Sequence, residues 1–368
     1  MTNPIHQLAK MGQSVWYDNI ERRLLDNGGL ADMITNGDIQ GLTSNPSIFK
    51  NAIVNSSDYD NALQALAADG KSTDEIIEHL TVNDIQEAAK LLLPLYEETK
   101  GLDGYASLEV RPTLAYDTDN TLAEAKRLWQ WVDVPNLMIK IPATDDGLPA
   151  IRQAIAAGIN VNVTLIFSIE RYREVAEAYL LGLEDRLATG QPIDKIASVA
   201  SFFISRLDSA VDKQLEGVGS DRAAKLMGKT AVANAKLAYQ AFKEIFNTER
   251  FAGLQQQGAN LQLPLWASTS TKNPAYPDTL YVDELIGRNT VNTVPPKTLD
   301  AFRDHGSVKE TLKTNLVEAN KLFIELAVLG ISLADVTQKL EDDGVKAFMD
   351  AYQDLVETVN GRQLIAVQ

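Results

Sequence analysis

A single lysine interrupts an apolar run, and its position points more clearly to chemistry than any other. Lys140 lies in Leu137–Pro142, which is otherwise apolar and closes with a proline. Such a run is typical of a parallel strand buried on both faces. Burying an ammonium ion is costly unless it is paired or gives up its proton, and a neutral lysine amine attacks carbonyl carbons to form a Schiff base. Lys140 is therefore a candidate nucleophile; a structural ion pair, or a side chain that reaches water at the strand end, is the alternative.

Further polar residues lie within other strand-like runs. Asn160, Asn162 and Thr164 share one face of a strand by period-two alternation. A buried polar face needs hydrogen-bond partners, which either the neighbouring strands or the hydroxyl groups of a substrate would supply. Asp18 ends one run and Glu109 lies within another. These two carboxylates are candidate acid and base groups for a reaction at the lysine.

Small polar side chains end another of these runs. Thr43, Ser44 and Asn45 directly precede a proline. Taken singly, Asp18 also fits a helix N-cap, and Asn45 fits a turn residue before proline. In a barrel of parallel strands, however, all such strand ends converge on one face, where active sites are built. The convergence favours a functional site over packing.

Cations and hydroxyl groups follow two later strands. Ser201 and Arg206 flank the end of one of them, and Ser268 and Lys272 follow the next. Arginine can fork onto a phosphate, and lysine supplies a point charge. These groups are candidates for binding a phosphate, while a solvated helix start is the alternative for Arg206. The sequence contains neither a Gly-rich dinucleotide motif nor a P-loop, so no motif supports nucleotide binding.

Eight strand-like runs alternate with helical patterns, which predicts an α/β fold with a parallel sheet. The strands are expected at 14–18, 41–45, 105–110, 137–141, 161–167, 197–203, 263–268 and 290–294. Helices are expected at 73–100, after a capping box of Ser72 and Glu75, at 121–132, 169–189, 206–215 and 221–246, and after Ser307. Eight strands fit a closed (β/α)₈ barrel, although the pattern also fits an open doubly wound sheet. We expect one domain over residues 1–368, with a helical insertion around 46–104 and extra C-terminal helices.

Composition narrows the class of protein. The chain of 368 residues is 45% hydrophobic and has no cysteine, so neither a disulfide framework nor a thiolate nucleophile is expected. A net charge of −16 argues against a nucleic-acid partner. His6, His79 and His305 are far apart without metal-ligand spacing, so no metal site is expected. The sequence has neither a membrane span nor a signal peptide, and we expect a cytoplasmic protein.

The order and spacing of these segments resemble those of transaldolases. The resemblance covers nearly the whole chain and is to the longer bacterial subfamily rather than to the short fructose-6-phosphate aldolase type. It implies a single (β/α)₈ barrel, sugar-phosphate substrates and no cofactor, while a monomer and a homodimer both remain open. The matching segments are Tyr17-Asp18, Thr43-Ser44-Asn45-Pro46, Leu108-Glu109-Val110, Ile139-Lys140-Ile141-Pro142, Asn162-Val163-Thr164, Ser201 with Arg206, and Trp266-Ala267-Ser268.

The resemblance also implies a role for each position. Lys140 would form the Schiff base at C2 of a ketose, Asp18 would act as acid and base on the C4 hydroxyl, and Glu109 would move protons through a water held by Thr164. Asn45, Asn162 and Ser201 would hold substrate hydroxyl groups and orient the carboxylates, and Thr43 would bind the sugar with them. Arg206, Lys272 and Ser268 would bind the phosphate. The alternation of the strand, rather than the resemblance, adds Phe203 to the substrate-binding residues. Lys272 departs from the better-known branch, which has a second arginine there after a slightly shorter loop. A lysine holds the charge but not the fork.

The expected function is transfer of a dihydroxyacetone unit from a ketose phosphate to an aldose phosphate in the pentose phosphate pathway. The donors are sedoheptulose 7-phosphate and fructose 6-phosphate, and the acceptors are glyceraldehyde 3-phosphate and erythrose 4-phosphate. One alternative is an aldolase of the same mechanism that releases free dihydroxyacetone, and another is a non-catalytic barrel that binds sugar phosphates. Phe203 shares a strand face with Ser201, and an apolar ring there is expected to favour transfer over release.

Overall fold

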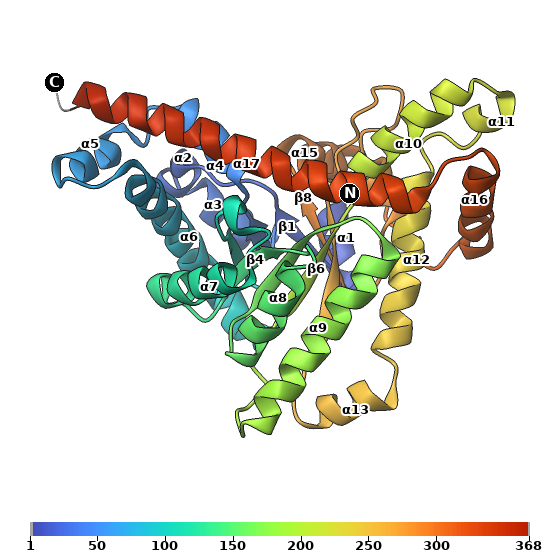
Figure 1. Ribbon diagram of the computed structural model, residues 1–368, viewed down its shortest axis with the longest axis horizontal. Helices are drawn as coiled ribbons and strands as arrows, with labels where there is room; N and C mark the ends of the chain where they lie inside the picture. The colour runs from blue at the N-terminus through green and yellow to red at the C-terminus, as the bar shows by residue number, and fades with distance from the viewer. Residues whose placement is uncertain (1–2, 367–368) are drawn as a thin grey trace.

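Eight parallel strands form a closed barrel in the computed structural model, which describes residues 3–366 (Figure 1). The strands follow one another around the barrel in chain order, and β1 pairs with β8 to close the ring. The predicted (β/α)₈ barrel is confirmed, and the open sheet is wrong because it would leave β1 and β8 apart. The strands are β1 (Gln13–Tyr17), β2 (Gly41–Thr43), β3 (Ala106–Glu109), β4 (Leu137–Pro142), β5 (Val161–Ile166), β6 (Ser198–Phe203), β7 (Gln262–Ala267) and β8 (Thr290–Val294).

Helices connect consecutive strands and surround the barrel (Figure 1). They are α1 (Pro4–Met11), α2 (Arg22–Asp26), α3 (Gly29–Thr35), α4 (Pro46–Val54), α5 (Asp60–Ala68), α6 (Thr73–Glu98), the 3₁₀ turn η1 (Pro112–Leu114), α7 (Thr118–Val132), α8 (Gly147–Ala156), α9 (Ile169–Ala188), α10 (Ser205–Val218), α11 (Asp221–Ala224), α12 (Thr230–Ile245), α13 (Glu249–Gln256), α14 (Leu280–Glu284), α15 (Pro296–His305), α16 (Leu316–Val328) and α17 (Leu333–Ala366). No helix within residues 3–366 is long and apolar enough to cross a membrane.

The long helix α6 begins where its capping box predicts. The backbone N–H of Ser72 donates to Glu75 Oε2 over 2.9 Å, and the Ser72 hydroxyl accepts from the N–H of Glu75. These bonds satisfy N–H groups that have no partner within the helix. Together with α4 and α5, α6 spans most of the chain between β2 and β3. The segment expected to be a helical insertion is therefore an enlarged crossover between two neighbouring strands.

The helix expected over 221–246 is in fact two helices, α11 and α12, so that prediction is wrong. Gly228 lies between them with φ of +70°, a left-handed conformation that interrupts a helix. Its N–H donates to Asp212 Oδ1 over 2.9 Å, and a Cβ atom there would lie 2.6 Å from the ring of Tyr276. The break depends on contacts with residues distant in sequence, which the local pattern does not reveal.

The C-terminal helix α17 crosses one end of the barrel (Figure 1). It contacts α4, α5 and α6 on one side, α10 on the other, and β5 between them. Gly344 lies at the contact with β5, where a Cβ atom would be 3.0 Å from Leu165 Cδ2. The helix therefore covers the face on which the carboxyl ends of the strands converge.

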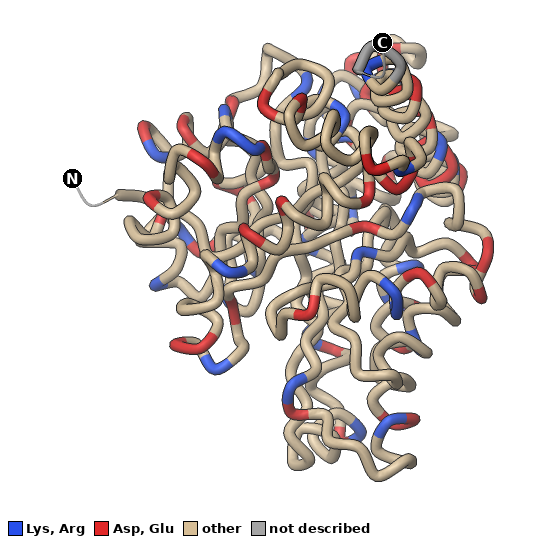
Figure 2. Tube along the Cα trace, turned by 90° about the vertical axis from the view of Figure 1, so that its left-hand side faces the viewer, with Lys and Arg blue, Asp and Glu red and all other residues tan. Residues whose placement is uncertain are grey.

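The barrel interior changes from apolar to polar along its axis. Trp16, Met138, Leu265 and Val291 form part of an apolar cluster inside the barrel. Lys140 is the next residue after Met138 on the same face of β4, and the polar layer of the barrel begins there. Figure 2 shows acidic residues spread along the helices, with basic residues among them. The protein has a net charge of −16, so the cationic groups of the cavity described below are set in a mostly acidic molecule.

Candidate active site

A cavity of about 130 Å³ lies at the carboxyl ends of the strands and brings together most of the residues singled out in the sequence. Its lining offers carboxylate, amide, hydroxyl and cationic groups that can form hydrogen bonds with the hydroxyl groups of a sugar. Its lining includes Asp18, Thr43, Asn45, Lys140, Ser201, Phe203, Arg206, Ser268 and Lys272, together with Thr293 and Phe348. Glu109, Asn162 and Thr164 lie on the strands that flank Lys140.

The strand register directs Lys140 into the barrel between two polar neighbours. Glu109 on β3 and Asn162 on β5 are its register partners, so all three side chains point inward. Lys140 is 4% exposed, and its Nζ donates to the carbonyl oxygen of Ser44 over 3.1 Å. It also lies 3.4 Å from Glu109 Oε2. The alternative in which the side chain reaches water is wrong, because the amine stays inside the protein, paired with a carboxyl group.

Glu109 lies close enough to the lysine to exchange a proton with it. Burial raises the pKa of Glu109 to about 7, against the opposing charge of Lys140. The carboxyl group can therefore hold or release a proton near neutral pH. Glu109 Oε2 and Thr164 Oγ1 are both buried and lack a hydrogen-bond partner among the described residues. Such groups usually bind an ordered water or a ligand.

A hydrogen bond from a threonine hydroxyl group holds Asp18 in the cavity. Thr43 Oγ1 donates to Asp18 Oδ1 over 2.8 Å and lies 2.5 Å from Thr293 Oγ1. Burial raises the pKa of Asp18, while Lys140 and the Thr43 bond oppose the rise. A raised pKa makes the carboxylate a stronger base toward a hydroxyl group. The N-cap alternative for Asp18 is wrong, because α2 begins with Glu21 at its N-cap.

The amide side chains have partly structural roles. Ser201 Oγ donates to Asn162 Oδ1 over 2.7 Å, and Asn162 Nδ2 donates to Ser107 Oγ over 3.0 Å. Asn160 Nδ2 donates to two backbone carbonyl groups, and Asn160 Oδ1 accepts from the backbone N–H of residue 197. Neighbouring segments of the barrel therefore satisfy the hydrogen bonds of this side chain. Asn45 accepts from the N–H of Ile48 as the N-cap of α4. Asn45 thus has both the local role expected before a proline and a place in the cavity.

Two cations form the far end of the cavity. Arg206, near the start of α10, lies with Cζ 5.4 Å from the ring centroid of Phe203. Lys272 Nζ donates to Ser270 Oγ over 2.7 Å, and Ser268 Oγ lies 2.9 Å from a second serine hydroxyl on α10. Burial lowers the pKa of both cations, and the charge of Arg206 lowers that of Lys272 further. Within residues 3–366 neither side chain has a carboxylate ion pair, so both charges remain available to a phosphate.

Two features of the site could not be predicted from the sequence around the candidate residues. Phe348 of α17 lines the cavity, with its ring centroid 5.9 Å from Lys140 Nζ, although some 200 residues separate the two along the chain. Leu165 has φ of +62°, and the register of β5 against β6 shifts between Val163 and Ile166. This bulge lies directly after Thr164. The described residues contain no cluster of metal-binding side chains.

Replacing Lys272 by alanine is expected to raise KM for phosphorylated donors about tenfold or more, because one charge-assisted hydrogen bond contributes about 1.5–3 kcal/mol. The value of kcat should change much less, since the phosphate is remote from the reacting carbons. Steady-state kinetics with fructose 6-phosphate measure both constants. Lys272→Arg is the matched control and should retain a low KM. Unchanged kinetics in Lys272→Ala would return the side chain to a surface role.

A closed barrel with a buried lysine beside a carboxyl group, facing a cavity with two cations, defines an imine-forming enzyme of the aldolase type. The model of the Transaldolase/Fructose-6-phosphate aldolase family matches residues 15–359, and the chain belongs to this family. It is similar to proteins named Transaldolase from Thermobifida fusca, 49% identical over all of both chains, and Mycolicibacterium smegmatis, 49% identical over 96% of each. A third, from Frankia alni, is 47% identical over 98% of this chain and 97% of its own.

Proposed function

We propose that the protein is a transaldolase that carries a dihydroxyacetone unit on Lys140 between sugar phosphates. The observation that supports this most strongly is the placement of Lys140, whose amine is 3.4 Å from Glu109 and lines the same cavity as Asp18. One carboxyl group serves imine formation and the other serves the carbon–carbon bond. The family and its similarly sized relatives agree with this reaction.

Imine formation uses Lys140 and Glu109. The amine adds to the C2 carbonyl carbon of the ketose, and the carbinolamine then loses its hydroxyl group as water when Glu109 gives it a proton. A proton transferred from the ammonium to Glu109 prepares both groups, leaving a free amine beside a carboxylic acid. Thr164 Oγ1, which has a free hydrogen-bonding position within residues 3–366, would hold the water.

Carbon–carbon cleavage uses Asp18. The carboxylate takes the C4 hydroxyl proton, the C3–C4 bond breaks, and its electron pair moves into the protonated imine to give an enamine. The aldehyde leaves, while the three-carbon unit stays on Lys140. In the reverse direction, Asp18 protonates the acceptor's aldehyde oxygen as the enamine attacks its carbon. Arg206 and Lys272 would position the phosphate at the far end of the cavity.

Borohydride reduction with fructose 6-phosphate, followed by peptide mass spectrometry, tests this function. A reduced three-carbon adduct on the peptide containing Lys140 is the expected result. Binding without any adduct would instead favour a non-catalytic barrel. Release of free dihydroxyacetone at the full rate of aldehyde formation, with an acceptor present, would favour the aldolase.

The loss of one proton from the pair of Lys140 and Glu109 is expected to set a pH limit on imine formation. The pKa of Glu109 is raised to about 7, so below pH 7 most Glu109 is already protonated and cannot take the proton of the Lys140 ammonium, and the competent fraction falls about tenfold per unit. The rate of borohydride-trapped imine formation should therefore rise with pH up to about 7 and then level off. Glu109→Gln should be slower, and the rise with a midpoint near pH 7 should disappear from its profile. A wild-type rise near pH 7 that persists in Glu109→Gln would contradict the assignment.

We further infer that the described residues, 3–366, form one domain and that the protein acts in the cytoplasm, as a monomer or a homodimer. The enlarged crossover between β2 and β3 and the C-terminal helix contact each other across the same barrel, which supports a single domain. Phosphorylated sugars are charged and stay in the compartment where they are made, which supports the cytoplasm. Limited proteolysis tests the domain, since one domain yields no stable barrel fragment that lacks α17.

A further inference from the structure

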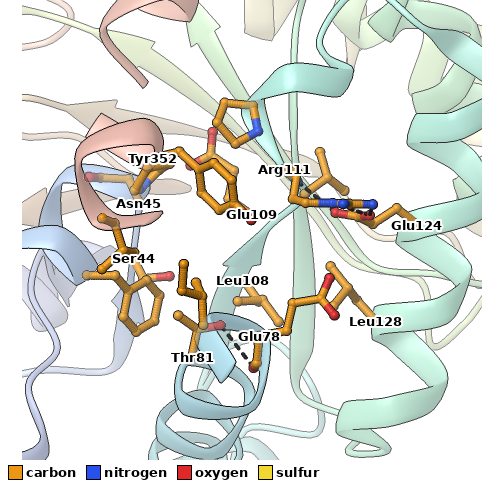
Figure 3. A pocket seen from close by; sticks show the side chains of 16 residues that line it. Ser44, Asn45, Glu78, Thr81, Leu108, Glu109, Arg111, Glu124, Leu128 and Tyr352 are labelled. Carbon is orange, nitrogen blue, oxygen red and sulfur yellow. Dashed lines mark hydrogen bonds and ion pairs between the residues drawn. The ribbon is translucent and has the colours of Figure 1, made fainter. Parts of the chain in front are cut away.

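Figure 3 shows a second, smaller cavity of about 60 Å³. Asn45 lines both this cavity and the main one, so the two lie beside each other. Its walls come from α4, β3, α6, α7 and α17. In Figure 3, Ser44 and Asn45 lie on one side, Arg111 and Glu124 on the other, and Thr81 and Glu78 below. The lining includes Glu109. The cavity therefore reaches Glu109, whose carboxyl group faces Lys140.

The ion pair of Lys140 and Glu109 lies between the two cavities. Lys140 lines the main cavity and Glu109 lines the small one, and Lys140 Nζ lies 3.4 Å from Glu109 Oε2. Apart from this ion pair, the oxygen is buried and has no hydrogen bond in the described part of the chain. The small cavity thus approaches the reacting amine from behind, on the side away from the substrate.

The outer end of the small cavity is polar and reaches the surface. Arg111 and Glu124 form an ion pair of 2.7 Å, and Arg127 pairs with both Glu124 and Glu78. The side chains of Arg111 and Glu78 are 38% and 19% exposed. A cavity holds a water molecule when it offers about 10–15 Å³ and several polar partners. This one has the volume and the partners for a short chain of water molecules.

We propose that the small cavity is a water port for Lys140, a role that rests on the proposed function. Imine formation releases one water molecule from C2, and imine hydrolysis consumes one. At both moments a sugar phosphate occupies the main cavity, so water cannot easily pass that way. The water leaves Glu109 toward the surface, past Thr81 and the Arg111–Glu124 pair, and returns by the same path. The enamine stage needs no water, so a narrow port supplies hydrolysis without flooding the substrate side.

Substitutions that fill the small cavity with a larger side chain test this proposal. Thr81 of α6 lines the cavity, and its hydroxyl bonds the carbonyl oxygen of Glu78 in its own helix. Thr81→Leu extends a longer apolar side chain into the space. Thr81→Val has nearly the shape of threonine and leaves the space open, so it is the matched control. Leu128→Phe fills the cavity from the opposite wall, on α7, and serves as a second plug if Thr81→Leu folds poorly.

The readout is the fate of the C2 oxygen. Fructose 6-phosphate labelled with ¹⁸O at C2 is the donor, erythrose 4-phosphate is the acceptor, and mass spectrometry follows the label in the heptulose phosphate at early turnover. With an open port, the released water exchanges with solvent and the product carries solvent oxygen. With a plugged port, the same water is returned to C2. We expect label retention in Thr81→Leu to rise about tenfold over wild type and Thr81→Val, which corresponds to about 1.4 kcal/mol of added barrier to water exchange.

Two results would overturn the port. One is a product from both plugged variants that is as free of label as the wild-type product. The other is slower turnover without label retention, which indicates a packing defect rather than trapped water. Failure of the proposed function is distinct, since wild-type protein would then form no heptulose phosphate from these substrates.

Discussion

Replacing Lys140 by methionine will abolish turnover, with kcat lowered by at least about ten-thousandfold, the scale of loss when a covalent nucleophile is removed. Methionine has a similar length and no charge, so it fills the buried position without a cavity. Glu109 will not be left as a buried anion, because burial already raises its pKa to about 7 and loss of the lysine charge raises it further. Steady-state kinetics and borohydride trapping measure the effect. Binding of fructose 6-phosphate should persist, because Arg206 and Lys272 are intact.

The chain supplies a matched control for this substitution. Lys236 on α12 is also buried, at 3% exposed, and its Nζ lies 2.9 Å from Glu284 Oε2. It lies outside the main cavity. Lys236→Met therefore removes a buried, paired lysine without touching the candidate site, and its kcat should stay near the wild-type value. Substantial turnover by Lys140→Met would show that the lysine is a structural ion pair.

The alternation of polar and apolar residues within strands was enough to predict much of the site. Because parallel strands keep a fixed register, Glu109, Lys140 and Asn162 had to lie side by side once the barrel closed. The burial of each strand on both faces made the polar positions conspicuous in the sequence. The fold and the polar layer were therefore predictable from local pattern and strand count.

Contacts between distant segments could not be predicted in this way. Phe348 reaches the lysine because α17 crosses the barrel, and the packing of Gly344 against Leu165 fixes that crossing. Helical periodicity shows which face of α17 is apolar, but not what it covers. The small cavity beside Glu109 likewise depends on five elements that meet in three dimensions. Gly228 belongs to the same class, because its conformation fits a contact with a ring in another loop.

The second large effect is expected for Asp18→Asn, which should lower kcat by about 10²–10⁴, the usual contribution of a positioned general base. Asparagine has the same shape and can still accept the bond that Thr43 donates to Asp18 Oδ1. Imine formation depends on Lys140 and Glu109, so it should continue. Borohydride should then trap the intact six-carbon sugar on Lys140, where wild-type protein gives the three-carbon adduct. The mass of the adduct therefore reports which step has been lost.

Asp103→Asn is the control for loss of a carboxyl group at the opposite end of the barrel, in the loop before β3. Asp103 accepts from Trp16 Nε1 over 2.9 Å and lines a different cavity, and burial raises its pKa to about 6. Its replacement should leave both kcat and the three-carbon adduct unchanged. If Asp18→Asn also yields the three-carbon adduct at the wild-type rate, Asp18 does not act on the C4 hydroxyl. The raised pKa of Asp18 would then reflect its surroundings alone, as the raised pKa of Asp103 does.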